Sequence, residues 1–153
     1  AGRFGTIDVL EYSPAGAADP SMMIAPSAAE PSDVQKQMEF YLYGAMAATR
    51  AVLPAMKAAG SGTLLFTTGG GSVDPVPMLG SVNAAAAALR NWSINLHKEL
   101  AGTGVHAAHV AINVAIDVST IPGFPVAPAS EIAQAYWQLT ESRDVPEIVF
   151  SKS

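Results

Sequence analysis

The chain has 153 residues, of which half are apolar and 14% are charged, with a formal net charge of −5 at pH 7 and a sequence pI near 5.0. This length and composition predict one globular domain and exclude a disordered chain. The eight Lys and Arg residues are scattered, so we expect no nucleic-acid partner. The absence of cysteine excludes disulfides and thiolate metal sites.

The sequence also has no feature that directs it to a membrane. No apolar run approaches the roughly 18 residues that a membrane span needs. The first residues, AGRFGTIDVLEYS, lack the positively charged start and the apolar run of a secretory signal. We therefore expect no membrane partner and a cytoplasmic location.

The first predicted elements in chain order are a strand, a loop and a helix. TIDVLEY (residues 6–12) is short, apolar and β-branched, which indicates a buried strand. Residues 13–31 contain several prolines and predict a long loop. Ser32 then opens a helix, with Gln35 as its capping-box partner; the helix runs to Gly60 and should bend near Pro54.

The second part of the chain continues the alternation. GTLLFTT (62–68) predicts a strand that three glycines end, and a second long helix follows over about 81–101. On that helix the residues spaced for a buried face are Leu89, Trp92, Leu96 and Leu100. The remaining predicted elements are a third strand (105–116), a shorter helix (129–142) and a last strand (147–151).

This order of elements is β-α-β-α-β-α-β, with fully apolar strands. Such a pattern is typical of the α/β class, in which helices cover both faces of a parallel sheet. The sequence shows no internal repeat and no linker, so residues 1–153 are predicted to form a single domain.

Four segments in the same order carry a resemblance to a known family. They are FGTIDVLEYSPA, GAMAATRAVLPAM, GSGTLLFTTGG and AAALRNWSINLHKELAGTGVHAAHVAIN. Together they resemble the C-terminal two thirds of a short-chain dehydrogenase/reductase. The resemblance implies a Rossmann-like three-layer sandwich, with the N-terminal βαβ part absent from this chain and residues 1–153 forming a partial domain.

The family's catalytic residues are not found at the matching positions. The family uses a Tyr and a Lys four residues apart on the second long helix, so that both side chains share one helix face. Aligning the AAL tripeptide places Val82 at the Tyr position and Ala86 at the Lys position, and neither can donate a proton. The family's Asn position holds Tyr41, and its Ser position holds Gly69, or Thr68 after a slip of one residue.

Other residues are candidates for the missing chemistry. Shifting the helix alignment by one residue brings Ser81 to the Tyr position, so the catalytic candidates are Tyr41, Thr68 and Ser81. Tyr12, at the carboxyl end of the first strand, is a further candidate for a relocated acid. Packing accounts for aromatic residues more often than catalysis does, and turn or cap hydroxyls need no further role.

The resemblance implies that the full-length protein binds NAD or NADP. It leaves open whether this chain alone binds a cofactor at all. The family's Gly-rich phosphate-binding turn precedes the matched region, and TGGGS (68–72) follows the wrong strand for such a turn. The positions that match the family's cofactor contacts are Ser13, Pro14, Ala15, Thr67, Thr68, Ile112, Asn113 and Ala115.

The three histidines do not predict a metal site. His106 and His109 are an odd number of residues apart in a strand, so they face opposite sides of the sheet. His97 stands alone on a helix. We therefore expect no metal.

Two functions stay open, and with them whether the protein is an enzyme. One is a divergent NAD(P)-binding oxidoreductase that acts on a small carbonyl or alcohol with an unusual acid. The other is a non-catalytic binding or assembly subunit, which the loss of the proton donor favours. The resemblance implies a homo-oligomer, a dimer or tetramer, formed through the two long helices, with Ala84, Ala87 and Ala88 at the interface and Val82 and Ala86 lining the remaining cleft.

The first strand raises a separate question. Without a neighbour, IDVL (7–10) would be a bare apolar edge of the sheet, which invites aggregation. Either further chain of a longer protein or another subunit covers it, and we favour the first.

Overall fold

The computed structural model of the protein describes residues 5–14 and 23–152. Its main sheet has four parallel strands in the order β1-β2-β3-β6, so two strands far apart in the sequence, β3 and β6, lie side by side. The strands are β1 (Val9–Tyr12), β2 (Gly62–Gly69), β3 (Val105–Asn113) and β6 (Glu147–Ser151). A second, two-stranded sheet pairs β4 (Ala115–Ile116) with β5 (Val126–Ala127).

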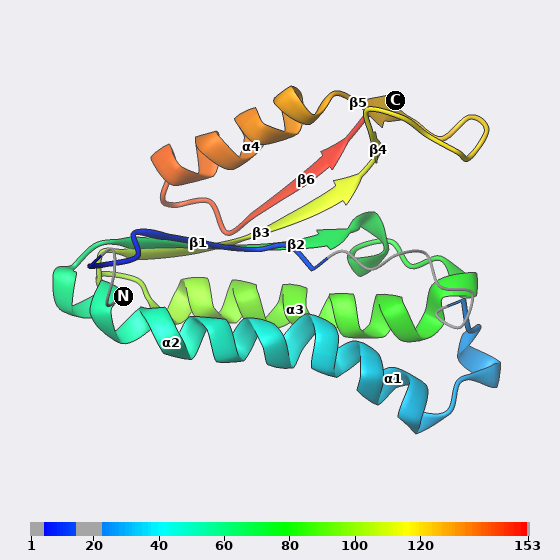
Figure 1. The fold of residues 1–153 in the computed structure, drawn as a ribbon, viewed down its shortest axis with the longest axis horizontal. Helices are drawn as coiled ribbons and strands as arrows, with labels where there is room; N and C mark the ends of the chain where they lie inside the picture. The colour runs from blue at the N-terminus through cyan, green and yellow to red at the C-terminus, as the bar shows by residue number, and fades with distance from the viewer. Residues whose placement is uncertain (1–4, 15–22, 153) are drawn as a thin grey trace.

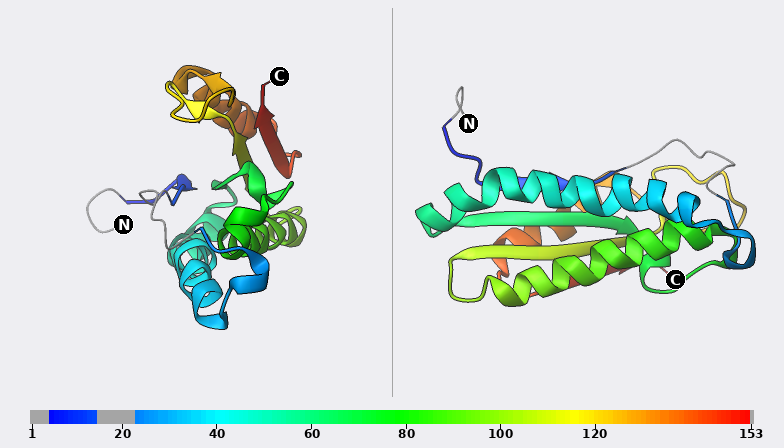
Figure 2. Two further views of the ribbon diagram at one scale, coloured as in Figure 1. Left: turned by 90° about the vertical axis from the view of Figure 1, so that its right-hand side faces the viewer. Right: turned by 90° about the horizontal axis from the view of Figure 1, so that it is seen from below.

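Helices cover both faces of the main sheet, which confirms the predicted α/β sandwich (Figures 1 and 2). On one face lie α1 (Pro31–Met38), α2 (Gly44–Ala59) and α3 (Gly80–Glu99). On the other face lies α4 (Ala129–Glu141). Short 3-10 turns cover Pro26–Ala28, Gly70–Ser72 and Pro77–Leu79. Among the described residues, no helix is long and apolar enough to cross a membrane.

The first long helix starts differently from the prediction. It begins at Pro31, not Ser32, and its capping box joins Glu30 to Asp33, whose carboxylate accepts a hydrogen bond from the Glu30 amide at 3.0 Å. Gln35 instead donates a hydrogen bond to Glu39. A π-helical segment, Glu39–Tyr43, joins α1 to α2, so one predicted helix is built in three parts.

Two strand boundaries also differ. The first strand begins at Val9 rather than at residue 6, and its register with β2 runs from Val9 opposite Thr63 to Tyr12 opposite Phe66. The third strand ends at Asn113, and β4 continues in a separate sheet. Within the described sheet β1 has a partner on one side, and Val9 is half exposed. The predicted bare edge is therefore present.

Side chains alternate between two cores, one on each face of the sheet. On the α2 and α3 side, Leu64 and Phe66 pack with Leu89, and Trp92 meets the Phe66 ring edge-on at 5.3 Å between centroids. The predicted buried face of α3 is confirmed, since Leu89, Leu96 and Leu100 are buried and Trp92 packs against them. On the α4 side the buried cluster is Leu65, Ala108, Val110 and Leu139.

Candidate functional site

The α3 residues that the sequence analysis aligned with the family's catalytic positions have apolar side chains. Val82 is half-buried, and Ala86 is 3% exposed. They line neither of the two larger clefts described below, contrary to the prediction. Ser81 is also buried, at 2% exposure, so its hydroxyl does not reach the surface. Its role as a catalytic group stays a prediction.

The two tyrosines predicted as relocated acids both pack inside the α2 face. Tyr41 is half-buried against the core, stacks edge-on with Phe40, and burial raises its pKa. The Tyr12 hydroxyl donates a hydrogen bond to the Phe40 carbonyl at 2.6 Å. Gly44 has no side chain where the Tyr12 hydroxyl lies, since a Cβ there would be 2.0 Å from that oxygen. Both tyrosines therefore have packing contacts, and a catalytic role for either one stays a prediction.

Thr68, the third catalytic candidate, belongs to a buried polar network. Its Oγ1 lies 2.8 Å from His109 Nε2 and 2.8 Å from the Ser72 hydroxyl. His109 Nδ1 lies 2.9 Å from the Glu147 carboxylate, and Arg90 holds that carboxylate with two hydrogen bonds. We call these five residues the Thr68 network.

The elements bring these residues together under α3. Thr68, His109 and Glu147 stand on the three neighbouring strands β2, β3 and β6, and in the β3–β6 register His109 is opposite Glu147. Arg90 reaches them from α3. Thr68 and Ser72 are 4% and 5% exposed, and His109 is 0% exposed. A group of this kind in an apolar core must satisfy its hydrogen bonds internally, as it does here.

The charges of the network fix its hydrogen-bond directions. Burial lowers the pKa of His109, although Glu147 acts in the opposite direction, so the imidazole is neutral at neutral pH. The hydrogen bonds from Arg90 lower the pKa of Glu147, so that carboxylate stays ionised. His109 therefore donates a hydrogen bond from Nδ1 to the Glu147 carboxylate, and its Nε2 accepts a hydrogen bond from the Thr68 hydroxyl.

The sequence analysis missed His109, Glu147 and Arg90. It considered the histidines only as metal ligands, and within the described residues no group of three or more His, Cys, Asp or Glu could hold a metal ion. His97 is also not alone, because its ring lies 5.5 Å from that of His106, centroid to centroid. The sequence does show a histidine and a glutamate within apolar strands. That the two side chains are in contact can be inferred only from the register between β3 and β6.

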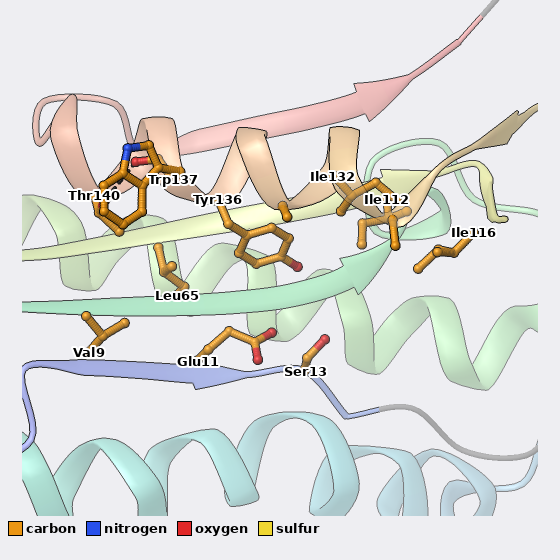
Figure 3. Close-up of a pocket in the computed structure, with 12 residues that line it drawn as sticks. Val9, Glu11, Ser13, Leu65, Ile112, Ile116, Ile132, Tyr136, Trp137 and Thr140 are labelled. Carbon is orange, nitrogen blue, oxygen red and sulfur yellow. Dashed lines mark hydrogen bonds between the residues drawn. The ribbon is translucent and has the colours of Figure 1, made fainter.

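A cleft on the other face of the sheet forms a second candidate site (Figure 3). We call it the α4 cleft; it has a volume of about 570 Å³ and lies between β1, the sheet and α4. Its walls are mainly apolar, with Leu65 at the base and Trp137 and Ile132 on α4. Its polar groups include Glu11, Ser13 and Tyr136, whose oxygens face the same part of the cleft.

Tyr136, also missed by the sequence analysis, is tied to the sheet. Its hydroxyl forms a short hydrogen bond with Thr67, and the Thr67 hydroxyl donates a further one to Glu11 at 3.4 Å. Burial raises the pKa of Tyr136, and hydrogen bonding with Thr67 and Ser13 lowers it. Because the Thr67 hydroxyl donates to Glu11, the protonated phenol of Tyr136 donates its hydrogen bond to Thr67.

The predicted cofactor positions divide between this cleft and other places. Ser13 and Ile112 line the α4 cleft, and Thr67 lies behind Tyr136. Thr68 faces the opposite side, in the Thr68 network. Asn113 packs against Gly70, where a Cβ would lie 2.5 Å from its side-chain oxygen. Pro14 and Ala115 are half-buried, and Ala15 lies outside the described residues.

The α4 cleft does not fit a diphosphate. A dinucleotide's phosphates need cationic side chains or free backbone N–H groups at a helix N-terminus. The side chains lining the cleft include the Glu11 carboxylate and no Lys or Arg. The side chains of the α4 cleft thus offer an apolar wall for a ring and no cation for the phosphates.

A third feature, the α3 cleft, lies beside the start of α3 and has a volume of about 590 Å³. It is walled by Pro75, Pro77 and Val76 and by the exposed Ala84 and Ala87. Its polar lining comes from two further residues, Ser72 and Asn83. The Asn83 side chain donates to the Val76 carbonyl at 3.0 Å, which holds the loop to the helix.

Comparison with known proteins gives the family and the fold. Residues 1–116 match the family model for short chain dehydrogenases. No curated protein sequence matches the chain. L-sorbose reductase from Gluconobacter frateurii, solved with NADPH and L-sorbose, is similar with a TM-score of 0.80 at 19% identity, over 99% of this chain and 67% of that one.

Two other solved structures are also similar to this chain. Acetoin dehydrogenase from Enterobacter cloacae has a TM-score of 0.82 at 21% identity, over 97% of this chain and 64% of that one. A halohydrin dehalogenase bound to an oxirane ester has a TM-score of 0.68 at 20% identity, over 93% of this chain and 54% of that one. The chain therefore spans about two thirds or less of these structures' lengths.

Proposed function

Because this chain belongs to the short-chain dehydrogenase family, we propose that it is part of a divergent NAD(P)-binding oxidoreductase whose proton chemistry does not use α3. The observation that supports this most is that the half-buried Val82 and the buried Ala86 align with the positions of the family's Tyr and Lys. Neither side chain can hold or move a proton. The fold by itself does not decide the reaction, since one structural neighbour is a dehalogenase.

We propose that NAD or NADP binds to the full-length protein and not to these 153 residues alone. A nicotinamide cofactor, when bound, supplies hydride transfer. The α4 cleft has apolar walls at Leu65 and Ile112 but places Glu11 where a phosphate would be repelled. We therefore propose that phosphate binding needs residues beyond those described.

Titration of NADH and NADPH tests this proposal. The fluorescence of Trp92 and Trp137 is followed in the 153-residue chain and in a longer protein that includes any preceding chain. We expect saturable binding to the longer protein and none to the 153 residues up to millimolar cofactor. Absence of binding to the longer protein would remove the oxidoreductase proposal, and tight binding to the short chain would contradict the cleft argument.

The helix face opposite the sheet favours a second candidate, a non-catalytic assembly subunit. Phe40, Tyr43 and Met46 are exposed large apolar residues around the start of α2, and Ala84 and Ala87 are exposed on α3. Small and apolar side chains of this kind suit close packing of helices between subunits. We propose a homodimer or tetramer through this face, and a Met46→Glu variant that lowers the mass measured in solution would support it.

A further inference from the structure

The Thr68 network joins a buried imidazole to a cleft through two hydroxyl groups. Ser72 lines the α3 cleft, Thr68 lies behind it at 2.8 Å, and His109 lies behind Thr68 at 2.8 Å. The far end is Glu147, whose side chain is 17% exposed and therefore in contact with solvent. The network thus extends from the solvent side of β6 to the α3 cleft.

We propose that His109 is the proton-exchanging group of this protein and that Thr68 and Ser72 carry its proton to the α3 cleft. Ser72 is the network residue that borders the cleft and can touch a ligand. The other charged or titratable residues act on the ligand only through it and are therefore positioning residues: His109, Glu147 and Arg90. This proposal rests on the proposed function only in one respect, namely that the proton carried by the network is used in a reaction of the enzyme. The network itself is a property of the described chain.

The hydroxyl directions give the proposal a mechanism. With neutral His109, the Thr68 proton points to Nε2, and Ser72 donates to the Gly69 carbonyl, 3.0 Å away. With His109 protonated, both ring nitrogens donate, so Thr68 turns its proton to Ser72, 2.8 Å away, while Ser72 keeps its hydrogen bond to Gly69. One proton gained at Nε2 therefore decides whether Ser72 accepts a hydrogen bond from Thr68.

Proton transfer from a ligand follows the same path. For this transfer the Ser72 hydroxyl first turns its proton from the Gly69 carbonyl to Thr68 Oγ1, 2.8 Å away. A ligand hydroxyl then gives its proton to Ser72 Oγ as the Ser72 proton moves to Thr68 Oγ1 and the Thr68 proton moves to His109 Nε2. No other bond to the ligand breaks, and the imidazolium formed lies beside the Glu147 carboxylate, 2.9 Å away. The proline, valine and alanine walls of the α3 cleft suit a small, mainly apolar molecule that carries this hydroxyl.

The charged groups around His109 support this role. Among the described residues, those acting on its titration are Glu147 from β6 and Arg90 from α3. Arg90 offsets the Glu147 charge, so the carboxylate orients the imidazole without fixing it in the charged form. Burial lowers the pKa of His109, which keeps the ring able to accept a proton at neutral pH.

Backbone NMR of the ¹⁵N-labelled chain tests the proposal without any cofactor. We expect the amide signals of Ser72 and Val73 to titrate with the same midpoint as His109 Nε2. Thr68→Val, which keeps the shape and removes the hydroxyl, should abolish this shared titration. Thr68→Ser should retain it, and so should Thr67→Val, the matched control on the opposite face of β2.

Two results would overturn the proposal. One is a wild-type protein in which the Ser72 and Val73 amides do not follow His109. The other is a folded Thr68→Val variant in which they still do. If Thr68→Val does not fold, Ser72→Ala removes the last hydroxyl, and continued titration of the Val73 amide in that variant would also count against it. Failure here leaves the cofactor titration untouched, so the two proposals fail separately.

Discussion

The two faces of the sheet differ in how completely the described chain covers them. On one face α2 and α3 close over a core in which Leu64, Phe66 and Leu89 are completely buried. On the other face α4 leaves the α4 cleft open, with Trp137 65% exposed at its side. The closed face holds the buried polar network, and the open face holds the apolar cleft. Stability and the proposed proton chemistry, with the α3 cleft beside it, are therefore expected on the closed face, and room for further chain is expected on the open one.

The largest expected effect on stability comes from two neighbouring leucines on β2 that face opposite sides of the sheet. Leu64 faces the closed core, and Leu65 borders the α4 cleft. We expect Leu64→Ala to lower the free energy of unfolding by about 3–5 kcal/mol and Leu65→Ala by about 2–3 kcal/mol, because a site already open leaves a smaller new cavity. Urea unfolding of both variants measures this. Equal losses would show that the two faces are equally packed.

Removing Glu147 should have the next largest effect. Glu147→Ala leaves the His109 Nδ1 proton and the Arg90 guanidinium without their partner, at a cost of about 1–3 kcal/mol. The matched control is Glu131→Ala on the open face, where an exposed pair with Lys152 is worth roughly 0–1 kcal/mol. Denaturant midpoints that fall equally for both variants would mean that the Thr68 network adds no stability.

Acidification should weaken the closed face through the same residues. The pKa of His109 is lowered on folding, so the unfolded chain binds its proton first and stability falls as the pH drops below 6.5. The pKa of Glu147 is also lowered, so its contribution is present above 4.5 and is lost as the pH falls further.

Urea midpoints measured from pH 8 to pH 4 would separate the two groups. We expect His109→Gln to flatten the upper part of the profile and to keep the lower part, which belongs to Glu147. A wild-type profile that stays level between pH 7 and pH 5 would contradict the assignment of His109 as a buried neutral imidazole.

The smallest effect is expected at Tyr136 on the open face. Tyr136→Phe removes the hydrogen bond to Thr67 and leaves the ring in place, which should cost about 0.5–1.5 kcal/mol. Thermal unfolding of the variant measures it, with Tyr43→Phe, an exposed tyrosine, as the control. A loss as large as that of Leu64→Ala would mean that the open face is not the weaker one.

The sequence predicted the fold well, whereas the contacts that build the candidate site could not be predicted from it. Local patterns were sufficient for β2, α3, α4 and β6, because apolar periodicity and glycine stops act within one element. The sequence analysis assigned the cap to Ser32 and Gln35, which are spaced in the same way as the true pair Glu30 and Asp33. It did not predict the π-helical segment.

The candidate site depends on contacts between elements. Thr68 was named as a candidate because a slip of one residue brings it to the family's Ser position. Its partner His109 lies 41 residues further along the chain, and Glu147 lies another 38 residues beyond His109. Tyr136 was overlooked because an aromatic residue on a helix predicts packing, and only the contact with Thr67 shows another use. Such pairings require the sheet order, which no local pattern contains.

The central claim is that the proton chemistry of this protein lies in the Thr68 network and not on α3. The most direct measurement is the ¹⁵N spectrum of the His109 ring at neutral pH. We predict a neutral ring with a protonated Nδ1 and an Nε2 that accepts a hydrogen bond, held in that single tautomer. A ring that exchanges between tautomers, as a solvated imidazole does, would contradict the account.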